Sequence, residues 1–243
     1  MIRRPLSGFA AVLIFAGLSG MLLAAPPAQK SPTKKAASAA KTSAPARSAD
    51  PAQSVTTISV DGVNDIDPAK AFGSKSAPVV MEVFSDFQCP ACKQLFLTTT
   101  QKIMDNYVTS GKVYLIHRDF PLPMHAYSRV AASYSRAAAH IGRCDEVEQA
   151  LFKNQEKWEV SGDIVGTVAA ALSPAEMKKV QAIVEGKSLE PLIEKDKQLA
   201  MAVPVNQTPT SILRTKSGQT FPVVGYVSYE VLKTFLDQLV AQK

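Results

Sequence analysis

The chain has 243 residues, of which 46% are hydrophobic and 20% are charged. This composition suits one ordinary folded domain and excludes a wholly disordered chain, a collagen and a polytopic membrane protein. The net charge of +6 lies entirely in residues 1–53, which carry seven basic side chains and one acidic side chain. From Ser54 onward 20 basic and 20 acidic residues balance each other, so no nucleic-acid partner is expected.

The N-terminal segment has the pattern of an export signal. Arg3 and Arg4 form a short positive region, and an uncharged apolar stretch follows from Phe9 to Ala25. The length of this stretch lies between that of a signal-peptide core and that of a minimal membrane span. The sequence therefore predicts a signal peptide or an N-terminal membrane anchor over residues 1–25, and export to the periplasm or cell envelope.

A tether is predicted over residues 26–53. They consist almost entirely of Ala, Pro, Ser, Thr, Lys and Gln and include no aromatic residue. Such a segment cannot bury enough apolar surface to offset its ordering entropy, so it is predicted to be a disordered linker. Attraction of its positive charge to anionic headgroups is an alternative to a simple solvated spacer. A folded domain is predicted over residues 54–243.

A strand–helix–strand unit opens the predicted domain. Val79 to Phe84 is an apolar run of strand length, and a sharp break follows at residues 85–88. Apolar positions then recur at helical spacing as far as Tyr107, and Val113 to His117 is a second strand. Two strands joined through a helix are expected to be parallel, with a right-handed crossover.

A block of helices is predicted over residues 125–202. Helices are predicted over residues 125–141, 144–153, 163–171, 174–185 and 189–202, with breaks at Gly162, at Ser173-Pro174 and at Gly186. The block interrupts the alternation of strands and helices, and it is therefore interpreted as an insertion.

Strands return after Pro209. Thr210 to Thr215 and Thr220 to Val224 flank a turn and form a predicted hairpin, and Pro222 marks the second strand as an edge strand. A last helix begins at Ser228 as N-cap. The predicted fold class is α/β, with a β-α-β half and a β-β-α half on either side of the helical insertion.

The sequence Cys89-Pro90-Ala91-Cys92 stands where the first strand passes into its helix. Proline suits the first helical position, which makes Cys89 the N-cap and places its sulfur at the positive end of the helix dipole. A thiolate stabilised there is what thiol–disulfide exchange requires. Cys92 falls on the core-facing side and is the shielded partner. The four residues are interpreted as a redox pair, with Pro90 and Ala91 tuning its properties.

Other interpretations of the two cysteines are an inert structural disulfide and half of a zinc site. Zinc would need a second cysteine pair or nearby histidines. The sequence has no second CxxC, and His117, His125 and His140 are not at ligand spacing, so neither a metal nor another cofactor is predicted. The third cysteine, Cys144, is interpreted as a small core residue, with a regulatory or intermolecular disulfide as the alternative.

Three segments resemble a known family. Phe84 to Cys92 resembles the active-site stretch of DsbA-like thiol:disulfide oxidoreductases of the thioredoxin superfamily. Arg118 to His125 resembles the segment after their second central strand, and Thr208 to Thr210 resembles the loop that carries a cis-proline facing the disulfide. The three motifs follow the family's order. The resemblance implies a thioredoxin fold with a helical insertion and a catalytic role for both cysteines of the motif.

The resemblance also implies what the protein acts on. Its substrates would be reduced or unfolded exported polypeptides, bound through the backbone of Thr208 beside cis-Pro209. A quinone-linked membrane oxidase would reoxidise it. An envelope disulfide reductase or isomerase is an alternative, and so is a non-catalytic CxxC protein that binds metal or has a structural role.

Two positions depart from the family pattern. A buried carboxylate often precedes the first cysteine by six residues and moves protons to the inner thiol, but this position is Val83 here. Glu82 is one residue earlier and therefore on the other face of the strand, so it is predicted to be an exposed acid without a relay role. Residue 91 is Ala, where strongly oxidising relatives have His.

Overall fold

The computed structural model describes residues 65–203 and 205–242. The predicted leader over residues 1–25, the predicted linker over 26–53 and the predicted start of the domain at residue 54 lie outside the described residues. In the described part of the chain, no helix is both long enough and apolar enough to span a membrane.

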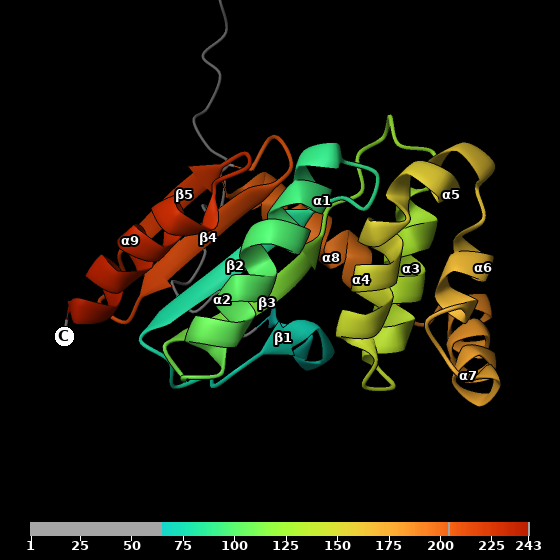
Figure 1. The fold of residues 1–243 in the computed structure, drawn as a ribbon, viewed down its shortest axis with the longest axis horizontal. Coiled ribbons are helices and arrows are strands. Elements are labelled where there is room, and N and C mark those ends of the chain that lie inside the picture. Colours follow the sequence, from blue (N-terminus) through green and yellow to red (C-terminus); the bar gives the residue numbers. More distant parts are fainter. Residues whose placement is uncertain (1–64, 204, 243) are drawn as a thin grey trace, which may run out of the picture. The chain divides into compact units, whose positions relative to one another are not determined.

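A mixed five-stranded sheet forms the centre of the domain, with the strand order β1-β3-β2-β4-β5 (Figure 1). The strands are β1 (Ala71–Phe72), β2 (Val79–Ser85), β3 (Val113–Asp119), β4 (Thr210–Thr215) and β5 (Thr220–Val224). β2 is parallel to β3, and the other neighbouring pairs are antiparallel. The predicted parallel unit and the predicted hairpin are therefore confirmed. β1 is too short to give a recognisable pattern in the sequence.

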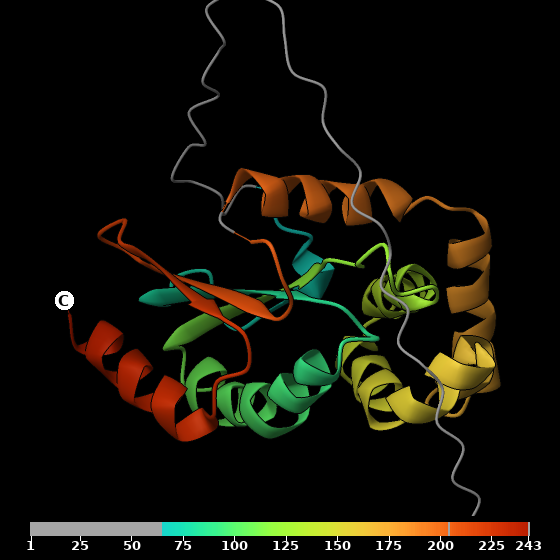
Figure 2. The ribbon, with the colours of Figure 1, turned by 90° about the horizontal axis from the view of Figure 1, so that it is seen from above.

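Helices cover both faces of the sheet, so side chains of the central strands are buried on both sides. Figure 2 shows α8 (Glu190–Ala202) over one face, and the helix after β2 together with α9 (Tyr229–Ala241) over the other. Every residue of β3 is buried, as expected for a strand enclosed on two sides. β5 alternates between exposed and half-buried residues and contains Pro222, which agrees with its place at the edge.

The helix after β2 begins at Pro90 and continues to Val108. It consists of α1 (Pro90–Leu95) and α2 (Gln101–Ile103), each followed by a five-residue π-helical segment. The side chains predicted to face the core are all buried, namely Cys92, Leu95, Phe96, Ile103 and Tyr107. Three of them pack in the core beside the sheet, whereas Cys92 and Phe96 pack against the insertion.

The helical insertion separates the two halves of the fold, as predicted. Its helices are α3 (Ser128–Ala139), α4 (Cys144–Lys153), α5 (Gln155–Ser161), α6 (Ile164–Ala169), α7 (Pro174–Glu185) and α8. Gly162 ends α5 with a φ of 74°, and Ser173 begins α7 in a capping box with Glu176. The sequence predicts no helix at α5, which is short and contains the buried side chain of the single tryptophan, Trp158.

Apolar side chains form two main cores in the domain. One lies between the sheet, the helix after β2 and α9, and the other lies in the insertion and includes Phe87, Cys89, Cys92 and Trp158. The two cysteines of the motif therefore lie at the boundary between the sheet and the insertion.

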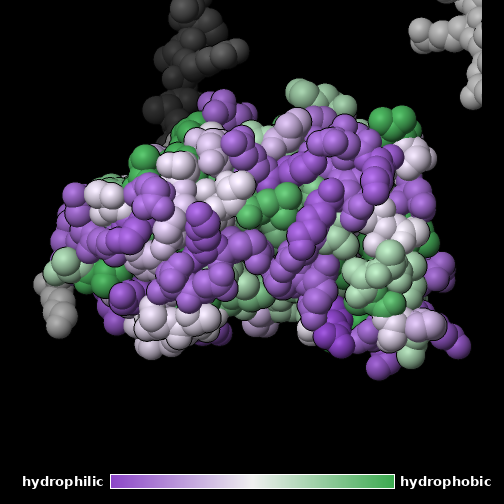
Figure 3. Space-filling model, viewed as in Figure 1, coloured by the Kyte–Doolittle hydropathy of each residue, from purple (hydrophilic) through white to green (hydrophobic). Residues whose placement is uncertain are grey.

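Figure 3 shows that the face seen in Figure 1 is mostly hydrophilic, with small, separated hydrophobic areas.

Candidate active site

The end of β2 and the start of α1 hold the cysteine pair. Cys89 is the N-cap of α1, and Pro90 is the first residue of the helix, as predicted. Both cysteines are free thiols in this structure. Cys89 is 8% exposed and Cys92 is 1% exposed. Pro90 is exposed and Ala91 is half-buried, so this dipeptide forms part of the surface next to the Cys89 sulfur.

The surroundings of Cys89 favour its thiolate. A hydrogen bond from the Cys92 thiol is the largest effect and, against the opposing effect of burial, the pKa of Cys89 falls to about 6. Smaller contributions come from the side chain of Thr208 and from the backbone N–H groups of Cys92 and Ala91. Cys89 makes no capping hydrogen bond through its side chain. The helix N-terminus therefore helps, as predicted, but the neighbouring thiol contributes more.

Cys92 has the opposite character. Burial, followed by the hydrogen bond to Cys89 and the charge of that thiolate, raises the pKa of Cys92 well above its ordinary value. The backbone N–H of Asp86 approaches its sulfur at 3.5 Å, which opposes the rise only in part. The two thiols thus divide into one that ionises near neutral pH and one that holds its proton.

We expect alkylation to reveal this difference. At mildly acidic pH, iodoacetamide should modify Cys89 first, with a rate that rises through a midpoint near pH 6, because only the thiolate reacts. Burial raises the pKa of Cys144 as well, so Cys92 and Cys144 should both stay unmodified under these conditions. Peptide mass mapping of the reduced protein measures the order of modification, and faster labelling of either buried thiol would contradict the assignment.

The loop before β4 brings Thr208 to the first cysteine. The Thr208–Pro209 bond is cis, which confirms the prediction for this loop. The Cys89 thiol donates a hydrogen bond to the Thr208 carbonyl oxygen at 3.4 Å. The Pro209 carbonyl oxygen in turn accepts the Gly225 N–H at 2.8 Å, which ties the loop to the end of β5. The N-cap of α1, the loop before β4 and the end of β5 therefore lie next to one another, although they are far apart in the sequence.

Asp86 is a site residue that the sequence patterns do not single out. Its side chain is buried and accepts hydrogen bonds from the Gln88 N–H at 2.7 Å, the Leu122 N–H at 2.7 Å, His125 Nδ1 at 2.9 Å and the Ser128 hydroxyl at 2.6 Å. These bonds join the loop that carries the cysteines to the beginning of the insertion. An acid between a strand end and an N-cap cysteine is the only signal for it in the sequence.

Gln155 supports the same loop from the insertion. Its buried side-chain amide donates to the carbonyl oxygens of Phe87 at 2.6 Å and Cys89 at 3.1 Å. Both acceptors belong to the turn that ends at the N-cap, so α5 holds the backbone of the reactive cysteine in place. Gln155 is distant from both acceptors in the sequence, and no local pattern predicts these hydrogen bonds.

The prediction for Glu82 is wrong in one respect. Glu82 does face away from the cysteine side of β2, but it is 1% exposed rather than solvent-exposed. Phe84, which lies on the same face of the strand, packs against Ala200 of α8, and this helix closes the face. Arg118 pairs with the Glu82 carboxylate at 2.7 Å, and Arg214 pairs with it as well. Buried acids require such compensation.

The third cysteine and the question of a metal site remain from the sequence analysis. Cys144 is buried at the start of α4, as expected for a core residue. Within residues 65–203 and 205–242, no group of three or more His, Cys, Asp or Glu side chains is arranged to hold a metal ion.

Known proteins are similar to this domain in sequence and in fold. A thioredoxin family model matches residues 65–237. The probable disulfide bond formation protein D of Bacillus cereus is 24% identical over 147 residues, which cover 58% of this chain and 68% of that protein. The disulfide bond formation protein D of Bacillus subtilis is 23% identical over 188 residues, which cover 73% of this chain and 76% of that protein.

Solved structures show the same fold. The crystal structure of α-DsbA1 from Wolbachia pipientis superimposes with a TM-score of 0.60 at 19% identity, and covers 71% of this chain and 91% of its own. Oxidised BdbD from Bacillus subtilis gives a TM-score of 0.57 at 20% identity, with coverages of 70% and 92%. From the family match, these relatives and the shared fold, the chain belongs to the thioredoxin family and is a DsbA-like thiol:disulfide oxidoreductase.

Proposed function

We propose that this protein forms or exchanges disulfides in exported polypeptides, with Cys89 and Cys92 as its redox pair. The observation that carries the proposal is the contrast between the two thiols, since the pKa of Cys89 is about 6 and that of Cys92 lies well above its ordinary value. An exchange centre needs one sulfur that is a good leaving group and nucleophile, and a second one that is protected from solvent.

The oxidised protein would react in two steps. A substrate thiolate attacks the Cys89 sulfur, the Cys89–Cys92 bond breaks, and Cys92 leaves with the electron pair as a thiolate that takes up a proton. A second substrate thiolate then attacks the substrate sulfur of the mixed disulfide and releases Cys89 as a thiolate. The substrate has lost two electrons to the pair. The backbone of Thr208 beside Pro209 would hold the extended substrate chain next to Cys89.

The pH dependence of the reduced state follows from the Cys89 pKa. The low pKa of Cys89 stabilises the reduced form of the pair relative to the disulfide. This stabilisation is complete at pH values above 9.0, the ordinary pKa of a cysteine thiol, and it is lost as pH falls through about 6. Compared with a dithiol of ordinary pKa values, the protein is therefore expected to gain oxidising strength as pH rises from acidic to neutral.

The place of action and the partners are part of the proposal. The apolar leader after Arg3 and Arg4 would direct export to the periplasm or cell envelope, and a quinone-linked membrane oxidase would restore the disulfide. N-terminal sequencing of the protein from the envelope fraction tests export. A protein found in the cytosol with its thiols permanently reduced would contradict it.

The residue at position 91 is expected to set the strength of the oxidant. Ala91→His adds an imidazolium that favours the Cys89 thiolate, and lowering the Cys89 pKa by one is worth about 1.4 kcal/mol, or about 30 mV for a two-electron couple. We expect a wild-type potential between about −270 mV for thioredoxin and about −120 mV for DsbA, and an increase of some tens of millivolts in the variant. Equilibration with glutathione buffers measures both, and an unchanged potential in Ala91→His would show that position 91 has no such role.

Two assays test the proposed function itself. The oxidised protein should convert a reduced, unfolded model polypeptide into its disulfide form, and it should catalyse insulin reduction in the presence of dithiothreitol. Cys144→Ser is the matched control, because that thiol lies outside the redox pair, and it should keep both activities. A protein inactive in both assays would favour the non-catalytic alternative. A potential at or below that of thioredoxin, with both cysteines reduced in living cells, would favour the reductase or isomerase.

A further inference from the structure

The turn between β2 and α1 is held from two directions. It comprises residues 86–89, and we call it the cysteine turn. Two of its N–H groups bond within the turn, to the carboxylate and the carbonyl oxygen of Asp86. Two of its carbonyl oxygens, those of Phe87 and Cys89, accept hydrogen bonds from the side chain of Gln155 instead. The N–H side of the cysteine turn therefore depends on the turn itself, whereas its carbonyl side depends on the insertion.

One amide group makes both contacts with the carbonyl side. Gln155 is 2% exposed, and its side-chain nitrogen lies 2.6 Å from the Phe87 carbonyl oxygen and 3.1 Å from that of Cys89. A carboxamide nitrogen carries two hydrogens, so these bonds use its whole donor capacity. The Cys89 oxygen also accepts the Lys93 N–H at 3.1 Å, which is the first hydrogen bond of α1. The amide and the start of the helix thus fix the same carbonyl group.

The insertion places Gln155 through a buried neighbour. Trp158 follows it by three residues in α5, so the two side chains lie on the same face of this helix. Trp158 is 1% exposed, and its indole N–H donates to the Leu151 carbonyl oxygen of α4 at 2.7 Å. α5 is therefore fixed to α4 with Gln155 directed at the cysteine turn.

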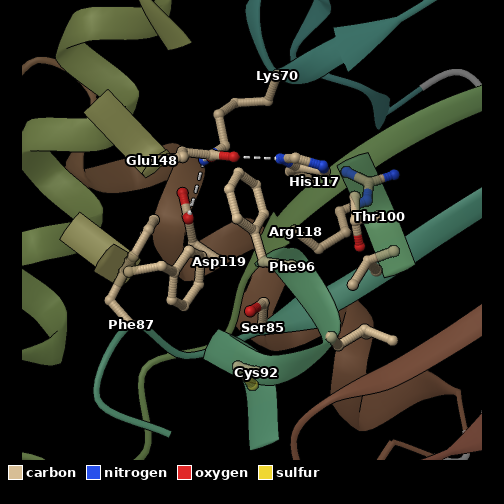
Figure 4. A pocket seen from close by; sticks show the side chains of 13 residues that line it. Lys70, Ser85, Phe87, Cys92, Phe96, Thr100, His117, Arg118, Asp119 and Glu148 are labelled. Carbon is tan, nitrogen blue, oxygen red and sulfur yellow. Dashed lines mark hydrogen bonds and ion pairs between the residues drawn. The ribbon is translucent and has the colours of Figure 1, made fainter. Parts of the chain in front are cut away.

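The same part of the insertion also packs on a side chain of the cysteine turn. The Phe87 ring stacks on Phe152 of α4, with the ring centroids 4.8 Å apart. Phe87, Phe96 and Cys92 line a small cavity of about 20 Å³, which is room for about one water molecule (Figure 4). With so little free space beside it, the turn keeps its position relative to the insertion, and the Cys89 carbonyl stays within reach of the amide.

The two hydrogen bonds also act on the charge of Cys89. A carbonyl oxygen carries partial negative charge, and one of these oxygens belongs to the same residue as the reactive sulfur. Negative charge so close disfavours a thiolate, whereas an N–H donor on the oxygen offsets this effect, more strongly where water is scarce. The disulfide form is neutral and does not respond in this way. The Gln155 amide is therefore expected to stabilise the reduced, ionised form of the pair relative to the disulfide.

We propose that Gln155 is a positioning residue that raises the oxidising strength of the redox pair from within the insertion. The inference rests on the proposed redox pair. Gln155 acts through the backbone, because it holds the Cys89 carbonyl in the N-cap conformation, with φ −77° and ψ 120°, and offsets the negative charge of that oxygen. In this conformation the Cys89 sulfur faces the Thr208 carbonyl oxygen at 3.4 Å. The steps of the exchange reaction are unchanged, and Gln155 shifts the equilibrium between the disulfide and the dithiol.

Gln155→Met tests the proposal, because methionine has a similar length and volume but no N–H donor in its side chain. In glutathione buffers at pH 7 the equilibrium should shift toward the oxidised protein by about threefold, at the lower end of what one hydrogen bond contributes. The rate of Cys89 alkylation at pH 5 should fall by a similar factor, because fewer molecules carry the thiolate. Mass spectrometry of acid-quenched mixtures measures both. An equilibrium and an alkylation rate equal to those of wild type would overturn the proposal.

Unfolding measurements separate this role from a purely structural one. The stabilities of the two redox forms and the redox equilibrium belong to one thermodynamic cycle, and the substitution leaves the cysteines of the unfolded chain unaffected. The reduced form of Gln155→Met should therefore lose more stability in urea than the oxidised form, by the same factor as the glutathione equilibrium. Equal losses in both forms would show that Gln155 only supports the fold, and would overturn the proposal.

Gln149→Met is the matched control. The Gln149 amide on α4 donates to the side chains of Gln101 and Asp145 rather than to the cysteine turn. Its loss should leave the glutathione equilibrium and the alkylation rate of Cys89 as they are in wild type. Equal shifts in the two glutamine variants would overturn the proposal. A wild-type protein that does not exchange with glutathione at all would instead overturn the proposed function.

NMR of the wild-type protein covers the case in which Gln155→Met fails to fold. The side-chain amide signals of Gln155 should move with a midpoint near pH 6 in the reduced protein, as Cys89 ionises, and stay constant over this range in the oxidised protein. The oxidised form is the control for other groups that titrate nearby. Gln155 signals that move equally in both forms, or in neither, would overturn the proposal.

Discussion

Cys92→Ala is expected to stop the reaction at the mixed disulfide. The variant keeps Cys89 and can still attack a disulfide, but it has lost the sulfur that releases the partner. Turnover should fall to the uncatalysed rate, while a covalent adduct between Cys89 and the disulfide partner accumulates. Non-reducing electrophoresis and mass spectrometry of the variant with a protein disulfide measure the adduct, which should disappear on treatment with dithiothreitol.

Cys89→Ser should abolish turnover in a different way. Here the accessible nucleophile is absent, and Cys92 is 1% exposed with a pKa well above its ordinary value, so no adduct should form.

The variant Cys92→Ala should also lose part of the reactivity of Cys89 at pH 6, because the thiol that contributes most to the low pKa of Cys89 has been removed. Adducts in Cys89→Ser, or full turnover in either variant, would contradict the assignment of the redox pair.

Asp86→Ala is expected to destabilise the domain by about 3–5 kcal/mol, because it removes a buried carboxylate that accepts four hydrogen bonds. Two of the donors are backbone N–H groups, and leaving such groups buried without an acceptor costs about 1–3 kcal/mol each. A typical domain has only about 5–15 kcal/mol to lose, so the variant should unfold at a much lower denaturant concentration. Urea unfolding followed by circular dichroism measures the change.

Two further variants make the result for Asp86 specific. Asp86→Asn keeps an acceptor oxygen and should lose clearly less stability than Asp86→Ala. Glu156→Ala removes an acid that is mostly exposed and pairs with Lys93 at the surface, so it should leave the unfolding midpoint almost unchanged. Equal midpoints for Asp86→Ala and Glu156→Ala would show that the Asp86 hydrogen bonds add little to stability.

The local features of this protein are determined by its sequence. The apolar run of β2, the break after it and the proline after Cys89 together predict a strand, a turn and a helix N-terminus within one short segment. These features depend on the alternation of side chains and on the geometry of a helix start, which act between near neighbours. For the same reason the parallel unit, the hairpin after Pro209 and the helical insertion could be predicted, whereas α5 and the two-residue β1 could not.

The ionisation of the site was decided by the tertiary structure. The sequence predicts a stabilised Cys89 from the helix N-terminus, yet the largest contribution comes from the Cys92 thiol, and another comes from the side chain of Thr208, which is 119 residues away in the sequence. Glu82, Lys70 and Glu148 are charged. From the sequence alone such residues are expected at the surface, since removing a charged side chain from water is costly. Each is buried because distant segments supply a partner of opposite charge, as Lys70 and Glu148 do for each other across 78 residues of sequence.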